Sequence, residues 1–356
     1  MLSPARAVRG RGALTNASGR FESHQREVFD DGWGVDDEPK PLRTELTAEA
    51  ARTIITRNDS PDIGFDRTIN PYRGCEHGCI YCYARPSHAY MGLSPGVDFE
   101  SKLFFKPDAA RLLEAELSRP GYRCERIQLG ANTDPYQPIE RRLGVTRSVL
   151  EVLDRFNHPV GITTKSALPL RDLDILSSMA ARNLAKVAIS VTTLDRKLAR
   201  AMEPRAATPE RRLEAIRGLS EAGVPVIVSY SPVIPGLNDH EMETVLARAA
   251  EAGAREATMV LLRLPLEIKD LFAEWLEAER PDRARRVLSL LKQSRGGKLY
   301  TSQWGERMRG EGPVYALIAQ RFAKACARLG LSRTLAPLDT TRFRPPPRAG
   351  DQLSLL

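Results

Sequence analysis

The sequence predicts an α/β fold in which six strand–helix units form a partial barrel, with an irregular arm before it and helices after it. Short apolar runs alternate with amphipathic ones through the middle of the chain, and this alternation is typical of a parallel sheet. The 356 residues exceed a small domain but suit a barrel of about 250 residues with extensions. The 42% content of hydrophobic residues supports a large buried core. We therefore expect a partial (β/α)6 TIM-like barrel.

Residues 1–60 are expected to form a polar, largely irregular N-terminal arm. The segment begins with several arginines among small residues and continues into an acidic run at Asp30–Glu38. A charge-rich sequence of this kind does not favour a packed core. One helix is expected near the end of the arm, at Leu46–Ile54.

Residues 61–265 are expected to form the barrel. The clearest helix is Pro209–Ala222, in which apolar residues recur at helical spacing. Thr208 precedes it as an expected N-cap, and Gly223 can close its end. The predicted strands, each rich in Val, Ile or Leu, are Thr68–Tyr72, Arg126–Leu129, Val160–Thr164, Val187–Val191, Val226–Ser229 and Thr258–Leu262.

Residues 266–335 are expected to add helices that close the barrel, and residues 336–356 to form a flexible tail. Between the helices, Lys298–Arg309 interleaves basic and aromatic side chains in a glycine-containing loop. Such groups can stack on bases and contact phosphates. A plain connecting loop is the alternative interpretation.

Three of the five cysteines lie within eight residues, as Cys75, Cys79 and Cys82. This C-x3-C-x2-C spacing suits three corners of a 4Fe–4S cluster and leaves the fourth iron open. Thiolates are the soft ligands that such iron prefers, and Gly74 and Gly78 allow tight folding of the loop. An open iron suggests bound S-adenosylmethionine, whose reductive cleavage yields a radical. The spacing resembles that of radical S-adenosylmethionine (radical SAM) enzymes.

The three clustered cysteines have two alternative interpretations, a zinc site and a disulfide. A structural zinc site with His77 is possible in composition, but zinc loops usually present paired C-x2-C knuckles, and the sequence has no second pair. A disulfide is disfavoured because three clustered thiols cannot all pair among themselves. Cys124 and Cys326 are expected to be isolated core residues.

Polar residues follow the predicted strands, where the chemistry of such barrels is located. Thr133 and Asp134 are candidate acceptors for the methionine amine of the cofactor, and Lys165 is a candidate partner for its carboxylate. Because Asn, Asp, Ser and Pro are also common in turns, ordinary turn residues are the alternative interpretation.

Three further candidates lie at or beyond the end of the fourth predicted strand. Ser190 and Thr192 are expected to reach the ribose hydroxyls of S-adenosylmethionine. Arg205 is a second candidate for its carboxylate, although a surface arginine is an equally open interpretation.

From about Gly64 to Leu262 the chain resembles the spore photoproduct lyase-related group of radical SAM proteins, often labelled DNA repair photolyase. The resemblance implies a 4Fe–4S cluster on the three clustered cysteines and S-adenosylmethionine near Thr133, Lys165 and Ser190. The matching segments are Tyr81-Cys82-Tyr83, Ala131-Asn132-Thr133-Asp134, Thr164-Lys165, Ile189-Ser190 and Glu203-Pro204.

The resemblance also implies a reaction. The lyase splits a thymine dimer through a 5′-deoxyadenosyl radical and returns a hydrogen atom through a cysteine and two tyrosines. Tyr81 and Tyr83 match the tyrosines, but Asn132 stands where the cysteine is expected, and an amide N–H does not supply a hydrogen atom as a thiol does. This departure argues against authentic dimer-lyase activity. Tyr81 packing beside the cluster is the alternative to a catalytic role.

The last five residues, Gln352–Leu356, resemble the pentapeptide by which bacterial replication and repair proteins bind the sliding clamp. They follow the proline-rich stretch Phe343–Gly350, which would present them free of the fold. The glutamine amide would fix orientation while the leucines fill an apolar groove. A frayed chain end is the alternative.

The charge and hydropathy of the chain bound its partners. A net charge of +8 favours anionic partners such as DNA, or is simply a solvated surface. The sequence has no run of about 18 apolar residues and no secretory signal, so we expect no membrane partner. An oxygen-sensitive cluster with free thiols is expected in the cytoplasm, where an external electron donor would serve it.

These features lead to a ranked set of functions. The first is a radical SAM enzyme, lyase-like and acting on nucleic acid in DNA repair. The second keeps the radical chemistry but modifies a protein or a small molecule. The third is a clamp-associated DNA-binding protein in which the iron–sulfur cluster is structural.

Overall fold

The computed structural model describes residues 10–24, 42–334 and 336–347. Its centre is a seven-stranded sheet in the order β10-β9-β8-β7-β6-β3-β2. The strands are β2 (Ile55–Arg57), β3 (Arg67–Ile69), β6 (Ile127–Leu129), β7 (Val160–Thr164), β8 (Ala185–Ser190), β9 (Val226–Val233) and β10 (Glu256–Leu261).

Six of these strands, from β3 to β10, are parallel and follow one another in chain order. β2 is antiparallel to β3 and forms one edge of the sheet, with β10 at the other edge. The sheet is therefore an open, partial barrel, as the alternating sequence pattern predicts. Apolar strands of this kind are buried on both faces, and every residue of β3, β6 and β8 is buried.

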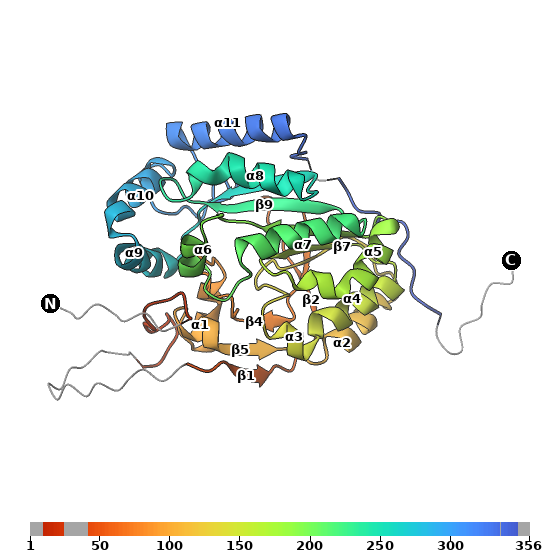
Figure 1. The fold of residues 1–356 in the computed structure, drawn as a ribbon. Helices are drawn as coiled ribbons and strands as arrows, with labels where there is room; N and C mark the ends of the chain where they lie inside the picture. The colour runs from red at the N-terminus through yellow and green to blue at the C-terminus, as the bar shows by residue number, and fades with distance from the viewer. Residues whose placement is uncertain (1–9, 25–41, 335, 348–356) are drawn as a thin grey trace.

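Helices cover the outer face of the sheet (Figure 1). The predicted helix near residue 209 is confirmed as α7 (Pro209–Glu221), and the Thr208 hydroxyl accepts a hydrogen bond from the N–H of Arg211 at 3.4 Å. The other helices between the strands are α1 (Asp98–Ser101), α2 (Ala109–Leu117), α3 (Glu140–Leu143), α4 (Val145–Arg155), α5 (Leu173–Ala181), α6 (Arg196–Met202) and α8 (Met242–Glu251).

A second, three-stranded sheet, in the order β1-β5-β4, lies beside the barrel. It consists of β1 (Glu45–Ala48), β5 (Lys102–Phe105) and β4 (Tyr72–Arg73). The predicted strand Thr68–Tyr72 is thus divided between the two sheets. The division falls at Asn70-Pro71, where the proline lacks the N–H that a continued strand would use.

The predicted helix Leu46–Ile54 is wrong. Leu46 instead lies opposite Leu103 in the β1–β5 pair, and Ile54 is fully buried with its N–H donating to the Glu116 carboxylate at 2.5 Å. Pairing with a strand more than 50 residues away overrides the local pattern. The described part of the arm beyond residue 42 therefore packs on the core rather than running irregularly.

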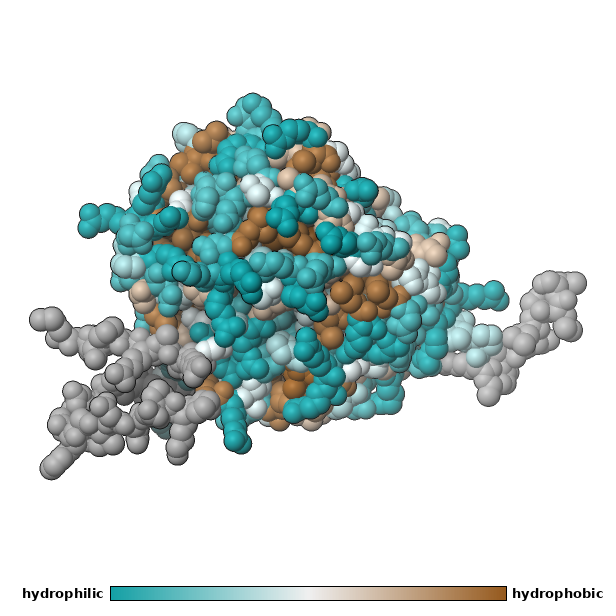
Figure 2. Space-filling view, viewed as in Figure 1, coloured by the Kyte–Doolittle hydropathy of each residue, from teal (hydrophilic) through white to brown (hydrophobic). Residues whose placement is uncertain are grey.

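Three helices follow the barrel, as expected for residues 266–335. They are α9 (Ile268–Glu279), α10 (Pro281–Gln293) and α11 (Gly312–Leu329), with Lys298–Arg309 in the connection before α11. None of the helices in the described residues is long and apolar enough to cross a bilayer. Hydrophilic residues dominate the face seen in Figure 2, and apolar residues appear there in separate groups.

Residues 336–347 differ from the expected flexible tail, because they run along the strand-start end of the barrel. Lys186 Nζ donates to the Ala336 carbonyl at 2.9 Å, and the Asp339 N–H donates to the Asn183 carbonyl at 2.9 Å. The Phe343 ring stacks on Phe156 with centroids 6.4 Å apart. Gln352–Leu356, the candidate clamp motif, lies outside the residues that the structure describes.

Candidate active site

The cysteine loop, residues 74–83, follows β4 at one end of the barrel. Cys75 and Cys79 are buried, Cys82 is half-buried, and all five cysteines of the chain are free thiols. Gly74 adopts a φ of +74°, and a Cβ atom there would lie 2.6 Å from the Leu103 side chain and 2.9 Å from the Phe99 carbonyl. Glycine is thus required at this position both by the left-handed backbone and by the space. Cys326 is buried as expected, and Cys124 is half-buried.

Arg85 supports the loop from behind. Its fully buried guanidinium donates to the carbonyls of Cys79 at 2.8 Å and Gly78 at 3.1 Å, and it pairs with the buried Glu100 carboxylate. The other contacts of Glu100 come from the N–H groups of Gly12 and Ala13, at 2.8 and 2.9 Å. The N-terminal segment is therefore fastened directly to the back of the cysteine loop.

Gln137 holds the loop from the barrel side. Its amide nitrogen donates to the Gly74 carbonyl at 3.1 Å, and its amide oxygen accepts from the Glu76 N–H at 2.9 Å. Gln137 is fully buried and lies in the segment after β6. One side chain thus satisfies two backbone groups of a loop that has no regular secondary structure to pair them.

Asp134 joins the cysteine loop to the end of β7. One carboxylate oxygen accepts from Thr164 Oγ1 at 2.7 Å and the Tyr136 N–H at 2.9 Å. The other accepts from the Lys165 N–H at 2.8 Å and lies 3.2 Å from His77 Nδ1. Burial alone would raise the pKa of Asp134, but the His77 ring and these hydrogen bonds outweigh it and lower the pKa to about 2.

These four contacts bear on the predicted role of Asp134. A carboxylate has about four lone-pair sites, and the donors named above fill them. The predicted role of Asp134 as an acceptor for the methionine amine of the cofactor stays a prediction. The Thr133 hydroxyl is buried and donates to the Tyr72 carbonyl at 3.0 Å, and its oxygen lone pairs can still accept a hydrogen bond. Both residues lie beside the cysteine loop, but their side chains hold the protein together.

The three thiols face a shared, strongly desolvated environment. Burial raises the pKa of Cys75, Cys79 and Cys82, and the neighbouring thiols Cys79 and Cys82 raise that of Cys75 further. The Lys165 ammonium acts in the opposite direction on Cys79 and Cys82. A bound iron cluster would itself favour the thiolates. Three converging free thiols, with a cation beside them, fit three-point ligation of a 4Fe–4S cluster.

The zinc alternative finds less support. Among the described residues, no group of three or more His, Cys, Asp or Glu side chains is arranged to hold one metal ion. His77 lies in the loop, but its Nδ1 atom faces the Asp134 carboxylate. The His77 ring is thus engaged with the barrel through the nitrogen that faces Asp134.

A buried carboxylate, Glu203, organises the far side of the site. It accepts hydrogen bonds from the Tyr81 hydroxyl and from Thr192 Oγ1, the latter at 2.7 Å, and it forms an ion pair with Arg212. Lys165 Nζ lies over the Tyr81 ring, 5.7 Å from its centroid. The Thr192 hydroxyl is thus engaged inside the protein, whereas Lys165 lies between the cysteines and the strand ends.

Ser190 and Arg205 also lie at this end of the barrel. Ser190 is buried at the end of β8, and its carbonyl accepts from Arg212 at 3.1 Å. Arg205 donates its N–H to the His77 carbonyl and extends its guanidinium to Glu76, each at 3.3 Å. The sequence-predicted cofactor residues therefore gather around the cysteine loop, although several use their polar atoms on each other.

The two predicted catalytic tyrosines face different surroundings. Tyr81 is buried against Glu203, whereas Tyr83 is 45% exposed and its hydroxyl donates to the Ala131 carbonyl. Asn132 follows directly and donates its N–H to Asn70 Oδ1 at 3.2 Å. Tyr83 and Asn132 are thus neighbours at the barrel mouth, and Tyr81 is apart from them.

Several aromatic and arginine side chains at this surface are here called the aromatic rim, and Tyr83 is its first member. The Arg263 guanidinium lies 5.3 Å from the Tyr83 ring centroid and donates to Met308 in the loop before α11 at 3.0 Å. Glu267, which follows Arg263 by four residues in the sequence, forms an ion pair with Arg20 at 2.6 Å. Members of the aromatic rim are Arg20, Phe21, Tyr83, Tyr90 and Arg263.

The distal part of the aromatic rim is a stack. The rings of Phe21 and Tyr90 lie 5.3 Å apart, and the Arg20 guanidinium lies 5.3 and 5.8 Å from their centroids. Both rings are more than half exposed. Exposed aromatic rings that are capped by an arginine form a ready surface for flat ligands.

Sequence reasoning missed much of this site. The omitted residues are Arg85, Glu100, Gln137 and Arg212, and the sequence indicates His77 only as a candidate zinc ligand. Glu203 and its following proline were part of the family resemblance, but nothing in the sequence paired it with Arg212. A buried Arg or Glu gives no periodic signal, so only its burial in the folded chain shows that it has a partner.

Comparison with known proteins identifies the family. Residues 69–249, half of the chain, match the family described as the Radical SAM superfamily. Uncharacterized proteins of Mycobacterium tuberculosis and Mycobacterium bovis are 36% identical over 230 residues, which cover 64% of this chain and 68% of each relative. An uncharacterized protein of Methanocaldococcus jannaschii is 29% identical over 178 residues, covering 50% of this chain and 64% of the relative.

Solved structures of spore photoproduct lyase share the fold. The lyase complexed with dinucleoside spore photoproduct superposes with a TM-score of 0.57 at 15% identity, covering 81% of each chain. A mutant with bound AdoMet and the same dinucleoside gives 0.55 at 16% identity with the same coverage. The chain thus belongs to the radical SAM superfamily and is related in fold to spore photoproduct lyase.

Proposed function

We propose that this protein is a radical SAM enzyme that acts on nucleic acid. Membership of the superfamily implies a 4Fe–4S cluster and S-adenosylmethionine, and we assign Cys75, Cys79 and Cys82 as the cluster ligands. Together these groups supply a 5′-deoxyadenosyl radical that abstracts hydrogen from a substrate. The observation that carries the choice of nucleic acid is the aromatic rim beside Tyr83.

We assign contacts with S-adenosylmethionine to the side chains that are not already engaged inside the protein. Lys165, between the cysteines and the strand ends, is the proposed partner of the methionine carboxylate, with Arg205 as a second cation. Ser190 is the proposed contact of the ribose. Asp134 and Thr192 are proposed to act by positioning, because Asp134 holds the Lys165 backbone and Thr192 holds Glu203.

The aromatic rim supports a nucleic-acid substrate on chemical grounds. Every base has a π-face, and stacking on an exposed aromatic ring contributes roughly 1–3 kcal/mol per base. Arg263 supplies positive charge beside the Tyr83 ring, as phosphate contacts require, and Arg20 lies beside the Phe21 ring while it is paired with Glu267. The loop Lys298–Arg309 joins the aromatic rim through Met308 and is held to Asp62 by Arg307 at 2.5 Å. Such a surface suits unpaired or flipped-out bases.

Tyr83 is the tyrosine that we propose meets the substrate. Desolvation of its hydroxyl by burial raises the pKa of Tyr83 to about 12. The phenol therefore keeps its proton at neutral pH. Its exposed ring opens toward the aromatic rim, whereas the Tyr81 hydroxyl faces Glu203 inside the protein. We infer a lyase-like repair reaction in which Tyr83, with Asn132 beside it, replaces part of the hydrogen-returning chain of the photoproduct lyase.

The experiment uses damaged oligonucleotides that carry deuterium at the lesion. Anaerobically reconstituted and reduced protein should transfer deuterium into 5′-deoxyadenosine, since the radical takes that atom directly. Formation of unlabelled 5′-deoxyadenosine, with no binding of single-stranded DNA, would favour the second function, in which a protein or small molecule is modified.

Binding gives an independent test of the aromatic rim. The double variant Phe21→Ala, Tyr90→Ala should bind a single-stranded oligonucleotide about 10-fold or more weakly in fluorescence anisotropy, because two stacking rings are lost. Leu317→Ala, which removes an equally exposed side chain from α11, is the matched control and should leave affinity unchanged. Equal affinities for all three proteins would remove the rim from the nucleic-acid site.

A further inference from the structure

A basic pocket of about 510 Å³ lies behind the cysteine loop. One wall is the N-terminal segment Gly10–Leu14, another is the exposed face of α6, and Trp275 and Glu279 of α9 close it. Figure 1 shows α6 and α9 next to each other at this end of the molecule. The cations that line the pocket are Arg11, Arg196, Lys197 and Arg200.

Among the residues that the structure describes, cations outnumber carboxylates in the lining of this pocket. Arg196, Lys197 and Arg200 are all exposed, and the carboxylate nearest to Arg196 is that of Glu210, at 3.9 Å. Among the residues that line the pocket, Glu279 is the single carboxylate. Such a concave surface of one sign attracts an oppositely charged partner and speeds its association.

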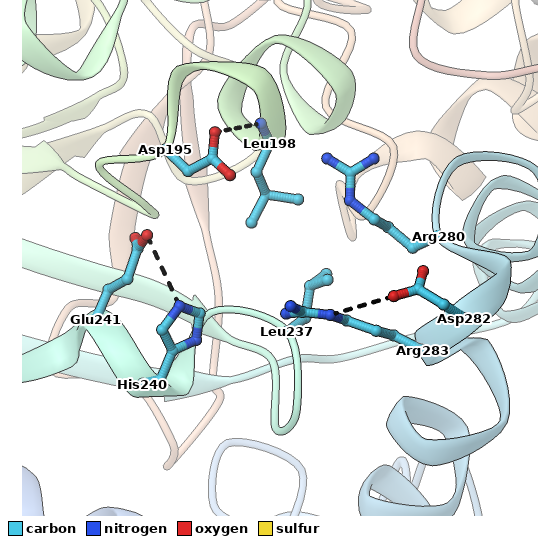
Figure 3. A pocket seen from close by; sticks show the side chains of 8 residues that line it. All are labelled: Asp195, Leu198, Leu237, His240, Glu241, Arg280, Asp282 and Arg283. Atoms are coloured by element: carbon cyan, nitrogen blue, oxygen red, sulfur yellow. Dashed lines mark hydrogen bonds and ion pairs between the residues drawn. The ribbon is translucent and has the colours of Figure 1, made fainter.

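A second pocket, on the other side of α6, differs in this respect. It has a volume of about 230 Å³, and its lining alternates charges of both signs (Figure 3). There His240 faces Glu241 at 4.0 Å, and Arg283 faces Asp282 at 3.7 Å. Within the described part of the chain, the excess of positive charge therefore lies on the face of α6 that adjoins the N-terminal segment.

The wall of the basic pocket is also the back wall of the cysteine loop. A Cβ atom on Gly12 would lie 1.9 Å from the Gly78 carbonyl oxygen, and one on Gly78 would lie 3.2 Å from Pro204. Both Gly12 and Pro204 line the pocket. Gly78 immediately precedes Cys79, so one layer of backbone separates the pocket from a cluster ligand.

Packed side chains also fill the space between the basic pocket and Cys79. Trp275 of the pocket wall belongs to one buried apolar cluster with Met202 and Cys79. The indole N–H donates to the Ala201 carbonyl at 3.2 Å, and the Ile80 N–H donates to the Met202 carbonyl at 3.0 Å. The path from the pocket to the cysteine is thus continuous, well-packed protein.

The substrate side of the loop faces elsewhere. Lys165, the Tyr81 ring and Asp134 approach the loop from the strand ends, whereas Gly12 and Arg85 cover its back. A partner in the basic pocket would reach the vicinity of Cys79 without displacing S-adenosylmethionine or a substrate at the barrel mouth. This position favours an electron donor over a nucleic-acid substrate.

We propose that the basic pocket is the docking surface for a small acidic electron-transfer protein with a flavin or iron–sulfur centre. The inference rests on the cluster assignment of the proposed function. In the step, the reduced carrier gives up one electron and is oxidised, and the cluster near Cys79 gains that electron, with no proton or group transferred. The exposed cations of α6 steer the acidic carrier, and the buried residues Trp275 and Gly12 close the back of the pocket beneath it.

Binding is the first test, and bacterial flavodoxin is the probe. The triple variant Arg196→Glu, Lys197→Glu, Arg200→Glu should weaken flavodoxin binding about 10-fold or more in biolayer interferometry at low salt. The affinity of the unaltered protein should also fall as salt is raised. A control with the same change in net charge, Arg285→Glu, Arg286→Glu, Lys292→Glu on α10, should bind as the unaltered protein does.

The second test separates electron delivery from the chemistry that follows it. With flavodoxin, its reductase and NADPH, the α6 triple variant should form 5′-deoxyadenosine about 10-fold more slowly, while dithionite should drive all three proteins equally. The proposal is overturned if flavodoxin binding and flavodoxin-driven turnover are unchanged, or if the variant loses oligonucleotide binding and not flavodoxin binding. Absence of 5′-deoxyadenosine even with dithionite would instead contradict the proposed function, and the binding test would still judge the pocket.

Discussion

Glu203 is the residue on which the buried part of the site depends. It receives hydrogen bonds from Tyr81 and Thr192 and an ion pair from Arg212, and it is buried throughout. A charge in such a position is tolerated only when partners satisfy it. Tyr81 and Lys165, stacked one over the other, are consequently held in place by this carboxylate.

Arg212→Met should therefore destabilise the protein by about 3 kcal/mol in urea unfolding, since removing one partner of a buried ion pair leaves the other charge uncompensated. Arg211→Met on the same helix removes an exposed arginine that pairs with Glu214, and should change the free energy of unfolding by less than about 0.5 kcal/mol. A similar small effect for both variants would show that Glu203 does not depend on Arg212.

The sequence was sufficient for some residues and not for others. The three cysteines and Gly74 follow from spacing and from backbone requirements that are local. Arg85 and Glu100, in contrast, meet only because the loop folds back, and Glu100 reaches Gly12 across 88 positions. Partnerships of this kind depend on tertiary packing, so no window of sequence reveals them.

Among the elements of the fold, the N-terminal segment at residues 10–16 has the role that the sequence indicated least. It was predicted to be irregular, yet it closes the back of the cysteine loop through Glu100 and lines the basic pocket. Its buried arginine, Arg11, donates to the Glu100 carbonyl at 2.5 Å and the Leu42 carbonyl at 2.9 Å. Burial and the nearby Arg205 charge lower the pKa of Arg11.

Gly12→Ala tests this element. The added methyl group would overlap the Gly78 carbonyl, so the segment must move away from the loop, and we expect less iron per chain after anaerobic reconstitution. Gly64→Ala, where an added Cβ meets nothing within 4 Å, is the control. Full iron loading of the Gly12 variant would show that the loop folds independently of the segment.

The strands of the barrel were predictable because their apolar runs are continuous and buried. β7 was predicted at Val160–Thr164, where it is found, and β6 differs from its prediction by one residue. β1 was not predictable, since its burial pattern is mostly exposed and it is ordered by pairing with β5. The domain boundaries at residues 60, 265 and 335 remain predictions.

In the whole molecule, three separate surfaces surround the cysteine loop. The strand ends approach the cysteines from the barrel, the aromatic rim leads away from Tyr83, and the basic pocket lies behind Gly78. Substrate, cofactor and electron donor would then each have their own approach. These three approaches are the arrangement that we propose, from the contacts and charges of the described residues.

The most direct test of the account measures iron content and 5′-deoxyadenosine together after anaerobic reconstitution and reduction. The unaltered protein should bind about four irons per chain and cleave S-adenosylmethionine, and Cys79→Ala should lose both properties. Cys124→Ala, which removes a half-buried thiol outside the loop, should keep both. Iron binding and cleavage that survive in Cys79→Ala, or an unaltered protein that takes up no iron, would contradict the account.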